Sequence, residues 1–407
     1  MPRTVRIGLI REGKTPPDAR VALSPKQCVE LMHNYPDLDI RVQPSPHRSF
    51  TDAEYAGNNI VLQEDLSDCD VLLGIKEVPV ADLIPDKTYL FFSHTKKAQP
   101  YNQPLMRALI EKRIRMIDYE CLTHSDGQRI LGFGHFAGVV GTHNGFRAWG
   151  KRTGAFELPA AHVEGTFSAL EQAYHNTVLP PIKVVLTGAG KVASGAVAVL
   201  EKLDVQSVEP EDFLEREYDY PVYVHLKGHH LYGRIDGGPY HRDDLHKNPT
   251  DYVCKFKPYL TKADMLVNGV YWDRTVPRLF DEEDMRVPGY RLNVIADITC
   301  DEGGSVPINR GASTIANPVY GIDCETGAVV APYQNESRYI DIMAVDNLPA
   351  ELPRDASEHF GTHLEKYVLN ALLDDGDPVI ERATICKDGQ LTERYQYLKE
   401  YAGLAEA

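Results

Sequence analysis

An apolar run at residues 182–187 passes directly into the glycine-rich segment Gly188-Ala189-Gly190-Lys191-Val192-Ala193 and then into an apolar stretch that ends at Leu203. This segment fits the pattern G-x-G-x-x-G/A between a strand and a helix. Gly188 permits a tight turn, Gly190 lets the backbone approach a pyrophosphate at the helix N-terminus, and the small Ala193 allows close packing of the helix on the strand. The pattern predicts a Rossmann-type βα unit that binds a dinucleotide, although a glycine-rich turn without a ligand has the same appearance.

Glu209 follows Gly188 by about 20 residues, at the end of a strand that we expect at residues 205–208. A ribose-binding carboxylate belongs at this place and favours NAD, because it would repel the 2′-phosphate of NADP. Four cationic or titratable residues come soon afterwards and could supply positive charge: Lys227, His229, His230 and Arg234. These residues therefore leave the choice between NAD and NADP open.

Short apolar runs before the glycine segment alternate with amphipathic stretches, which predicts a parallel α/β sheet. We expect strands at residues 5–10, 38–42, 71–75, 89–92 and 114–117. Ser24, Pro25 and Gln27 form the start of a helix with a capping box. The glycine-rich stretch 132–150 marks the expected crossover between domains, and residues 209–261 lack periodicity and predict an irregular excursion. Order returns with strands near 263–268 and 292–298 and a helix at 355–373.

The overall charge narrows the class of partner. The 59 Asp and Glu residues outnumber the 43 Lys and Arg residues and give a net charge of −16. This balance argues against binding of nucleic acid or of anionic lipid surfaces, which requires basic patches. We find no secretion signal and no apolar run of about 20 residues that could span a bilayer. The seven cysteines are scattered and form no Cys-x-x-Cys pair, which is typical of reduced thiols, so we expect a cytoplasmic protein.

Histidines gather in the excursion, at positions 225, 229, 230, 241 and 246. Their spacing does not form a closed ligand set, so we expect no metal site.

Lys76 and Glu77 end one apolar run, and His94 follows the next. Because the carboxyl ends of parallel strands line one ligand crevice, these side chains could face the same cleft. A buried lysine near other cations loses its proton more readily, so Lys76 and His94 could exchange protons at pH 7. The residues alone also allow a solvated Lys-Glu pair and a histidine with only a structural role.

Two arginines and an aspartate are further candidates. Arg20 and Arg129 could bind substrate carboxylates as bidentate forks, although surface arginines are common. Asp297 follows the strand near residues 292–296, which suggests a place close to a nicotinamide, although a cap or turn is equally economical.

Longer stretches of the chain resemble the saccharopine dehydrogenases (L-lysine-forming), that is, the lysine–2-oxoglutarate reductases. The likeness is greatest to the reductase half of the bifunctional aminoadipic semialdehyde synthases and extends more distantly to alanine dehydrogenase and the soluble nucleotide-binding part of transhydrogenase. The stretches that carry it are residues 20–25 (RVALSP), 74–77 (GIKE), 91–99 (FFSHTKKAQ), 117–120 (IDYE), 133–138 (FGHFAG), 297–305 (DITCDEGGS) and 345–353 (VDNLPAELP).

The resemblance implies an α/β protein of two Rossmann-like, doubly wound parallel-sheet domains that flank a cleft. A discontinuous substrate-side domain would comprise residues 1–133 plus 306–407. The dinucleotide-binding domain would comprise residues 134–305 and would be inserted in the first domain. The chain would correspond to the reductase part alone, so we expect only the first step of the bifunctional enzyme.

The resemblance also assigns roles. Lys76 and His94 would be the acid–base pair, with Glu77 and Glu120 tuning them. Arg20 and Arg129 would hold substrate carboxylates, and Asp297 would lie by the nicotinamide.

The expected reaction is the reversible reductive condensation of L-lysine with 2-oxoglutarate to saccharopine with NAD(P)H. The resemblance favours NADP, whereas Glu209 favours NAD. The partners would be these small molecules, with no nucleic acid and no membrane. An amino-acid dehydrogenase of the alanine type and a non-catalytic dinucleotide sensor are the alternatives. The amine donor, the physiological direction and the oligomeric state stay open.

Overall fold

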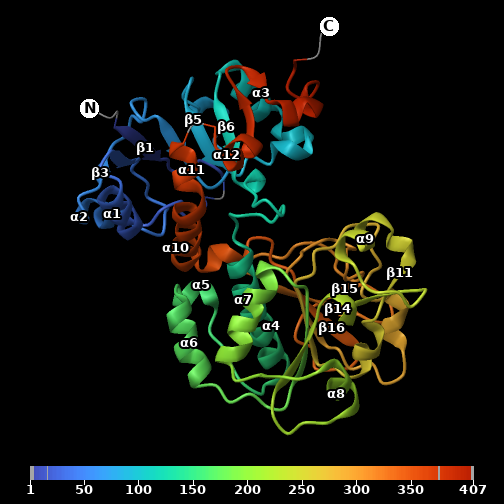
Figure 1. Ribbon diagram of the computed structural model, residues 1–407. Helices are drawn as coiled ribbons and strands as arrows, with labels where there is room; N and C mark the ends of the chain where they lie inside the picture. Colours follow the sequence, from blue (N-terminus) through green and yellow to red (C-terminus); the bar gives the residue numbers. More distant parts are fainter. Residues whose placement is uncertain (1–3, 16, 375, 405–407) are drawn as a thin grey trace. The chain divides into compact units, whose positions relative to one another are not determined.

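The chain divides into two compact units in the computed structural model, which describes residues 4–15, 17–374 and 376–404. The first unit comprises the residues up to Phe133 and from Pro353 onward, and the second comprises Gly134–Leu352. Each unit contains a largely parallel sheet with helices around it (Figure 1). The expectation of two Rossmann-like α/β domains is therefore confirmed.

The sheet of the first unit has eight strands among the described residues, in the order β18-β17-β6-β5-β4-β1-β2-β3. Six of them, β1 to β6, run parallel, and β17 adds an antiparallel edge beside β6. The bounds are β1 Val5–Leu9, β2 Leu38–Val42, β3 Val61–Leu62, β4 Val71–Leu73, β5 Thr88–Phe91, β6 Arg115–Asp118, β17 Thr384–Lys387 and β18 Gln390–Leu391.

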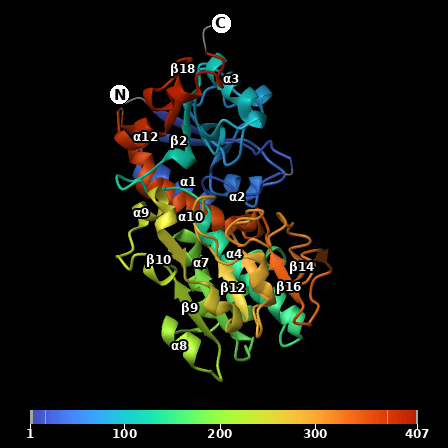
Figure 2. The same ribbon diagram turned by 90° about the vertical axis from the view of Figure 1, so that its right-hand side faces the viewer.

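Helices from both segments of the chain pack on this sheet. They are α1 Pro25–Asn34, α2 Asp52–Gly57, α3 Gln103–Glu111, α10 Pro353–Leu364, α11 Asn370–Leu373 and α12 Pro378–Ala383. Ser24 and Gln27 form the expected capping box of α1. The helix expected from residue 355 begins two residues earlier, at Pro353. Figure 2 shows β18 near α3, and β17 pairs with β6, so the C-terminal segment completes the sheet of the first unit.

The sheet of the second unit also has eight strands among the described residues, in the order β15-β14-β16-β13-β12-β7-β9-β8. The strands β16, β13, β12, β7, β9 and β8 run parallel to one another. Strand β14 pairs antiparallel with β16, and β15 pairs antiparallel with β14. The bounds are β7 Lys183–Thr187, β8 Gln206–Ser207, β9 Val222–Leu226, β12 Met265–Asn268, β13 Val294–Asp297, β14 Val319–Asp323, β15 Val329–Val330 and β16 Tyr339–Met343. A separate antiparallel pair consists of β10 Tyr232–Arg234 and β11 Tyr252–Cys254.

Two helices of the second unit pack backbone against backbone. The glycine-rich stretch after residue 133 forms α4, Gly134–Thr153, which lies beside α7, Lys191–Lys202 (Figures 1 and 2). A β-carbon at Gly138 would lie 1.9 Å from the carbonyl oxygen of Val192, and one at Gly195 would lie 1.9 Å from that of His135. Larger side chains at these two glycines would force the helices apart. The other helices are α5 Ala161–Glu164, α6 Phe167–His175, α8 Pro210–Glu215 and α9 Arg242–Lys247.

The second unit differs from the expectation at two places. We expected the chain to return to the first domain at residue 306, but β14, β15 and β16 extend the sheet through pairing with β13. Residues 306–352 thus belong to the second unit. The segment 209–261, expected to be irregular, contains β9, a buried strand of the central sheet. Its five residues, VYVHL, follow Asp219 and Pro221 and precede Lys227 and Gly228, so polar residues and turn formers on both sides mask the strand pattern.

Candidate active site and dinucleotide site

Four titratable side chains of the first unit follow the carboxyl ends of neighbouring parallel strands. Glu12 follows β1, Lys76 follows β4, His94 follows β5 and Glu120 follows β6, and these four strands are adjacent in the sheet. Because parallel strands end at one edge, this arrangement gathers acid–base groups where α/β proteins bind ligands.

Glu77 orients the imidazole of His94. The Nδ1 atom of His94 lies 2.7 Å from Oε1 of Glu77, and the Nζ atom of Lys14 donates to Oε2 at 2.9 Å. Burial opposes ionisation of Glu77, but the hydrogen bonds from His94 and Lys14 outweigh it and hold its pKa at about 2. An ionised Glu77 accepts the Nδ1 proton, which leaves Nε2 of His94 free to exchange a proton with a ligand.

Lys76 lies half-buried among other charges. Burial lowers the pKa of its amine, and the nearby Arg20 guanidinium lowers it further, while Asp18 opposes the change. Both effects increase the fraction of neutral amine near pH 7, which is the form that can accept a proton.

Glu120 forms a second anionic centre beside the histidine. Burial works against its charge, but Arg129, Lys96 and Lys97 keep the pKa of Glu120 below its usual value. Arg129 donates from Nη2 to Oε1 at 2.8 Å, and Lys96 lies 3.5 Å from the same oxygen.

Carboxylates of the chain itself engage both arginines expected to bind substrate. Arg20 is buried and donates from Nε and Nη2 to the two oxygens of Asp18, at 2.9 and 2.5 Å. Its guanidinium also stacks over the ring of Phe133 at 4.2 Å. Arg129 is more exposed and contacts Glu120. Contact of either arginine with a substrate carboxylate stays a prediction.

The glycine segment of the second unit has the local geometry expected for pyrophosphate binding. Gly188 has a φ of +104°, and a β-carbon there would lie 2.4 Å from the carbonyl oxygen of Gly269. Gly190 is the N-cap of α7, and a β-carbon at this residue would meet no atom within 4 Å. Ala193 is buried, and His225 on β9 donates from Nε2 to the carbonyl of Gly188 at 2.7 Å. The loop is thus anchored, and open space adjoins the helix N-terminus.

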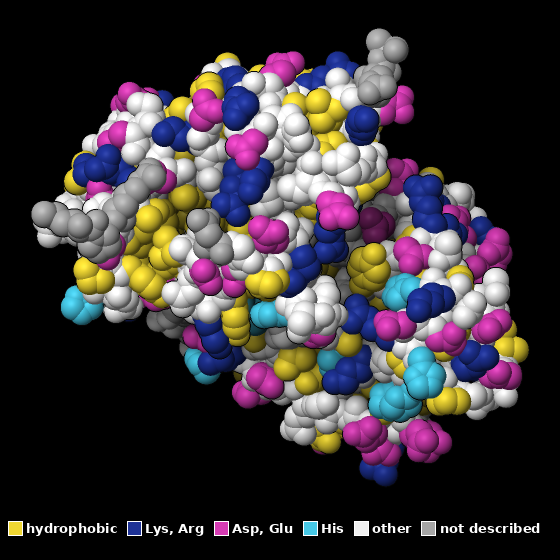
Figure 3. All heavy atoms as spheres, turned by 45° about the horizontal axis from the view of Figure 1, so that its top comes forward, with side chains coloured by type: hydrophobic (Ala, Val, Ile, Leu, Met, Phe, Trp, Pro, Cys, Tyr) yellow, Lys and Arg dark blue, Asp and Glu magenta, His cyan; other side chains and the backbone are white. Residues whose placement is uncertain are grey.

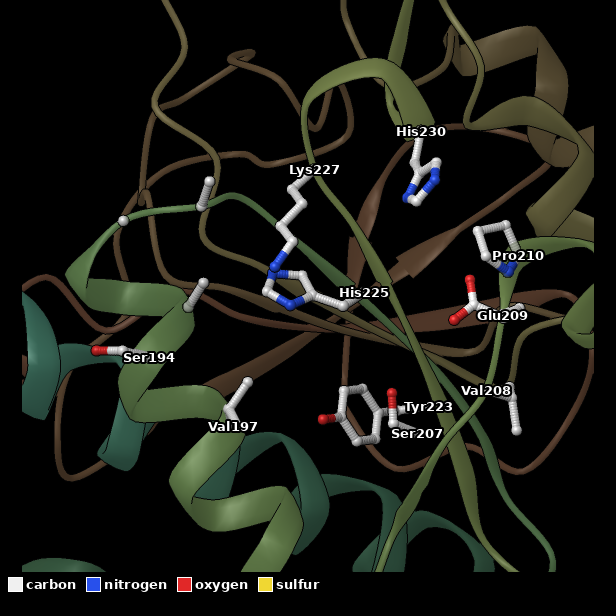
Figure 4. A pocket seen from close by; sticks show the side chains of 13 residues that line it. Ser194, Val197, Ser207, Val208, Glu209, Pro210, Tyr223, His225, Lys227 and His230 are labelled. Carbon is white, nitrogen blue, oxygen red and sulfur yellow. The ribbon is translucent and has the colours of Figure 1, made fainter.

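A cavity of about 540 Å³ adjoins this loop, as Figure 4 shows. Ser194 and Val197 of α7 border one side, and Glu209 lies across from them. The position of Glu209 in the sheet is not the expected one, because β8 is a two-residue edge strand and β9 pairs with β7 instead. Glu209 still lines the cavity, but as the N-cap residue of α8.

Two of the four cationic candidates line the cavity. Lys227, directly after β9, and His230 are among its lining residues (Figure 4). Arg234 instead forms ion pairs with three aspartates, Asp236, Asp244 and Asp251. The strand that pairs with β7 is β9, and the residue directly after β9 is Lys227 rather than a carboxylate.

Asp297 lies in a buried polar network rather than on a cavity surface. Its carboxylate accepts hydrogen bonds from Asn268 at 2.9 Å, Thr299 at 2.7 Å and Asn309 at 2.7 Å. Burial raises the pKa of Asp297 in spite of these bonds. Asn268 in turn accepts from Thr187, so the network links the carboxyl ends of β7, β12 and β13.

The substitution Asp297→Leu is expected to lower the free energy of unfolding by about 3 kcal/mol, because it leaves buried donors without their acceptor. Urea denaturation followed by circular dichroism measures this loss. The exposed Glu302→Leu, on the same loop, serves as the control and should change it by less than about 0.5 kcal/mol. Equal stability of the two variants would contradict the structural importance of this network.

Comparisons with known proteins agree with this geometry. Residues 8–140 match the family model "Alanine dehydrogenase/PNT, N-terminal domain". The mitochondrial alpha-aminoadipic semialdehyde synthase of Rattus norvegicus is 33% identical over 97% of this chain and 47% of its own length. The saccharopine dehydrogenase [NAD(+), L-lysine-forming] of Emericella nidulans is 25% identical over 87% of this chain and 89% of its own.

The chain is a homologue of these two groups of enzymes. It spans about half the length of the semialdehyde synthases that it matches. A solved L-alanine dehydrogenase has the same fold, with a TM-score of 0.64 and 17% identity over 98% of this chain and 100% of the other.

Sequence reasoning missed three residues of these two sites. Glu12 and Lys14 lie in the loop after the first strand, and His225 belongs to the group of histidines for which we expected no metal site and assigned no role. Their partners are 37 to 64 residues away in the chain. The position of Glu12 just after a strand was an available signal, because residues there face the ligand edge of a parallel sheet.

The described part of the chain shows neither a group of metal ligands nor a membrane-spanning helix. No group of three or more His, Cys, Asp or Glu residues there could hold a metal ion. None of the helices described is long and apolar enough to cross a bilayer. Figure 3 shows Lys and Arg side chains intermingled with Asp and Glu over the face in view.

Proposed function

We propose that this protein catalyses the reversible condensation of L-lysine with 2-oxoglutarate, NADPH and a proton to saccharopine, NADP⁺ and water. The observation that carries the proposal is the pair of Lys76 and the Glu77-oriented His94 at the ends of neighbouring strands. The semialdehyde synthase and saccharopine dehydrogenase homologues support it.

The reaction requires several proton transfers, which we assign to this pair. The ε-amine of lysine adds to the ketone carbon of 2-oxoglutarate and loses a proton, and the resulting hydroxyl gains a proton and leaves as water. The imine that remains takes up a hydride at carbon and a proton at nitrogen. Lys76, with its lowered pKa, and Nε2 of His94 accept and return these protons.

Glu77 keeps the imidazole in one tautomer throughout. Glu120, with its own charge held by Arg129, places a negative charge beside His94. We infer that Arg20 and Arg129 contribute positive potential toward the carboxylates of the substrates, and that Asp297 holds the strand ends near the nicotinamide.

The dinucleotide fits the second unit. Open space at Gly190, the N-terminus of the 12-residue helix α7 and the adjoining cavity suit a pyrophosphate and an adenosine ribose. The bound nicotinamide cofactor supplies the hydride. We infer a preference for NADP(H), because Lys227 offers a cationic group and His230 a hydrogen-bonding imidazole for a 2′-phosphate in the cavity that Glu209 also lines.

The substitution Lys227→Glu is expected to lower kcat/KM for NADPH by about 10- to 100-fold relative to NADH, since it replaces an attractive charge by a repulsive one. Steady-state kinetics with both cofactors measures the ratio. Lys247→Glu makes the same charge change on α9, away from the cavity lining, and should leave the ratio unchanged. An unchanged ratio in Lys227→Glu would exclude this lysine as the phosphate ligand.

The activity itself is tested by NADPH and NADH oxidation with lysine plus 2-oxoglutarate, with pyruvate plus ammonia, and with each compound alone. We expect turnover only with lysine plus 2-oxoglutarate. Turnover with pyruvate plus ammonia would identify an alanine-type dehydrogenase. Cofactor binding without turnover of either pair would identify a dinucleotide sensor.

A further inference from the structure

The loop between β1 and α1 places a carboxylate directly on the backbone that carries Lys76. Glu12 accepts from the N–H of Ile75 with Oε1 at 2.7 Å and from the N–H of Lys76 with Oε2 at 2.8 Å. One carboxylate thus binds two successive amides. Glu12 is 63 residues from Ile75 and 64 residues from Lys76 in the chain. Its two hydrogen bonds fix the backbone of residues 75 and 76 more firmly than one bond would.

These two amides need an acceptor because they find none in the sheet, although the carbonyl of Ile75 still accepts from the N–H of Phe92 at 3.0 Å. The strand β4 ends at Leu73, and the N–H of Gly74 still donates to the carbonyl of Leu90. Beyond Gly74 the neighbouring strands offer the N–H groups of residues 75 and 76 no carbonyl, and Glu12 takes that place. Without it, two partly buried donors would lose their partners and keep the cost of their desolvation. The direction in which Lys76 leaves the strand therefore depends on Glu12.

The surroundings make the charge of Glu12 sensitive to pH. Burial raises the pKa of Glu12 to about 7, against the two backbone hydrogen bonds, and Asp18 raises it while Arg20 lowers it. The buried hydroxyl of Tyr119 faces the same carboxylate, whose charge adds to burial in raising the pKa of that hydroxyl. Protonation of Glu12 would convert one acceptor oxygen into a donor, and one amide would then lose its bond.

We propose that Glu12 is a positioning residue for Lys76. The ionised Glu12 carboxylate holds the Ile75–Lys76 peptide, and the protonated carboxyl group releases it. The role deepens the proposed function, on which it rests, because it adds a group that acts through Lys76 without touching the substrate. Loss of the ionised form lowers the rate on the acid side of neutrality.

The test compares Glu12→Gln and Glu12→Leu with the wild-type chain. The glutamine keeps the shape and one acceptor, and the leucine removes both. We expect kcat to fall about 10-fold in Glu12→Gln and about 100-fold in Glu12→Leu, while the KM for NADPH stays within two-fold. The pH profile of kcat should lose its dependence on a group with a pKa near 7 in Glu12→Gln. Glu54→Gln is the matched control, because Glu54 also accepts from a backbone N–H of the first unit but lies in the capping box of α2.

A second readout does not depend on turnover. The rate of acetylation of Lys76 by acetic anhydride, followed by peptide mass spectrometry with the exposed Lys26 as reference, reports the environment of the amine directly. We expect the pH dependence of this rate to change in Glu12→Gln and to stay as in the wild type in Glu54→Gln.

The two readouts separate the possible failures. If Lys76 reactivity is altered in Glu12→Gln but the wild-type chain does not turn over lysine plus 2-oxoglutarate, the positioning role is supported and the proposed function is overturned. Normal reactivity and an unchanged pH profile in Glu12→Gln would overturn the positioning role. A loss of kcat that only follows a lower melting temperature, with the profile unchanged, would overturn it as well and leave Glu12 a purely structural residue.

Discussion

Replacement of Lys76 by methionine is expected to lower kcat by about 10²- to 10⁴-fold, the range typical for removal of a general acid–base group. Methionine has a similar length and fills the half-buried position, but it cannot accept or return a proton. Because Lys76 lies in the first unit and the cofactor cavity lies in the second, the dissociation constant of NADPH should change by less than about two-fold. Steady-state kinetics and quenching of NADPH fluorescence measure the two quantities.

Companion variants separate catalysis from folding. His94→Gln should give a loss of similar size, since the amide keeps a hydrogen bond to Glu77 but does not titrate. Lys26→Met removes an exposed lysine of the same unit and should leave kcat unchanged. Undiminished rates in both Lys76→Met and His94→Gln would remove this pair from the mechanism.

The substitution Gly190→Val is expected to raise the dissociation constant of NADPH by about 100-fold, which corresponds to about 2.7 kcal/mol. A β-carbon at Gly190 meets no protein atom within 4 Å, so the valine occupies open space at the start of α7 without disturbing the fold. That space is where the backbone amides of the helix would receive the pyrophosphate. Isothermal titration calorimetry measures the binding, and thermal unfolding checks the fold.

The control for this variant is Gly57→Val in α2 of the first unit, where a β-carbon also meets no atom within 4 Å. It should leave NADPH binding as in the wild type. Equal affinities in Gly190→Val and the wild type would mean that the pyrophosphate does not lie at the N-terminus of α7. Gly188→Val would be less informative, because its positive φ and the close carbonyl of Gly269 make a folding defect the expected result.

The features that the sequence could reveal are those set by neighbours along the chain. The β7–Gly188–α7 unit, the capping box at Ser24 and the places of Lys76 and His94 after strands follow from patterns of a few residues. The order of strands does not follow from such patterns. The exchange of β8 and β9, which moved Glu209 to the sheet edge, depends on pairing between segments far apart.

Long-range hydrogen bonds could not be predicted from the sequence pattern either. Glu12 reaches Lys76, and His225 reaches Gly188, only because the sheets bring their strands together. The return of the chain to the first unit was expected too early, because the antiparallel strands β14 and β15 carry no motif that distinguishes one sheet from the other. Periodicity predicts that a strand exists, but it does not predict the partner of that strand.

The division of the chain also has a consequence for its synthesis on the ribosome. The second unit is one continuous stretch whose last strand, β16, ends at Met343, so its sheet can close while translation continues. The first unit begins earlier but needs β17 and β18, which end at Leu391. A nascent chain therefore holds an unfinished sheet in its first unit, with the edge of β6 exposed, until the residues up to Leu391 have emerged. Such an edge is a site for pairing with other chains, and this protein would need chaperone protection at that stage of its production.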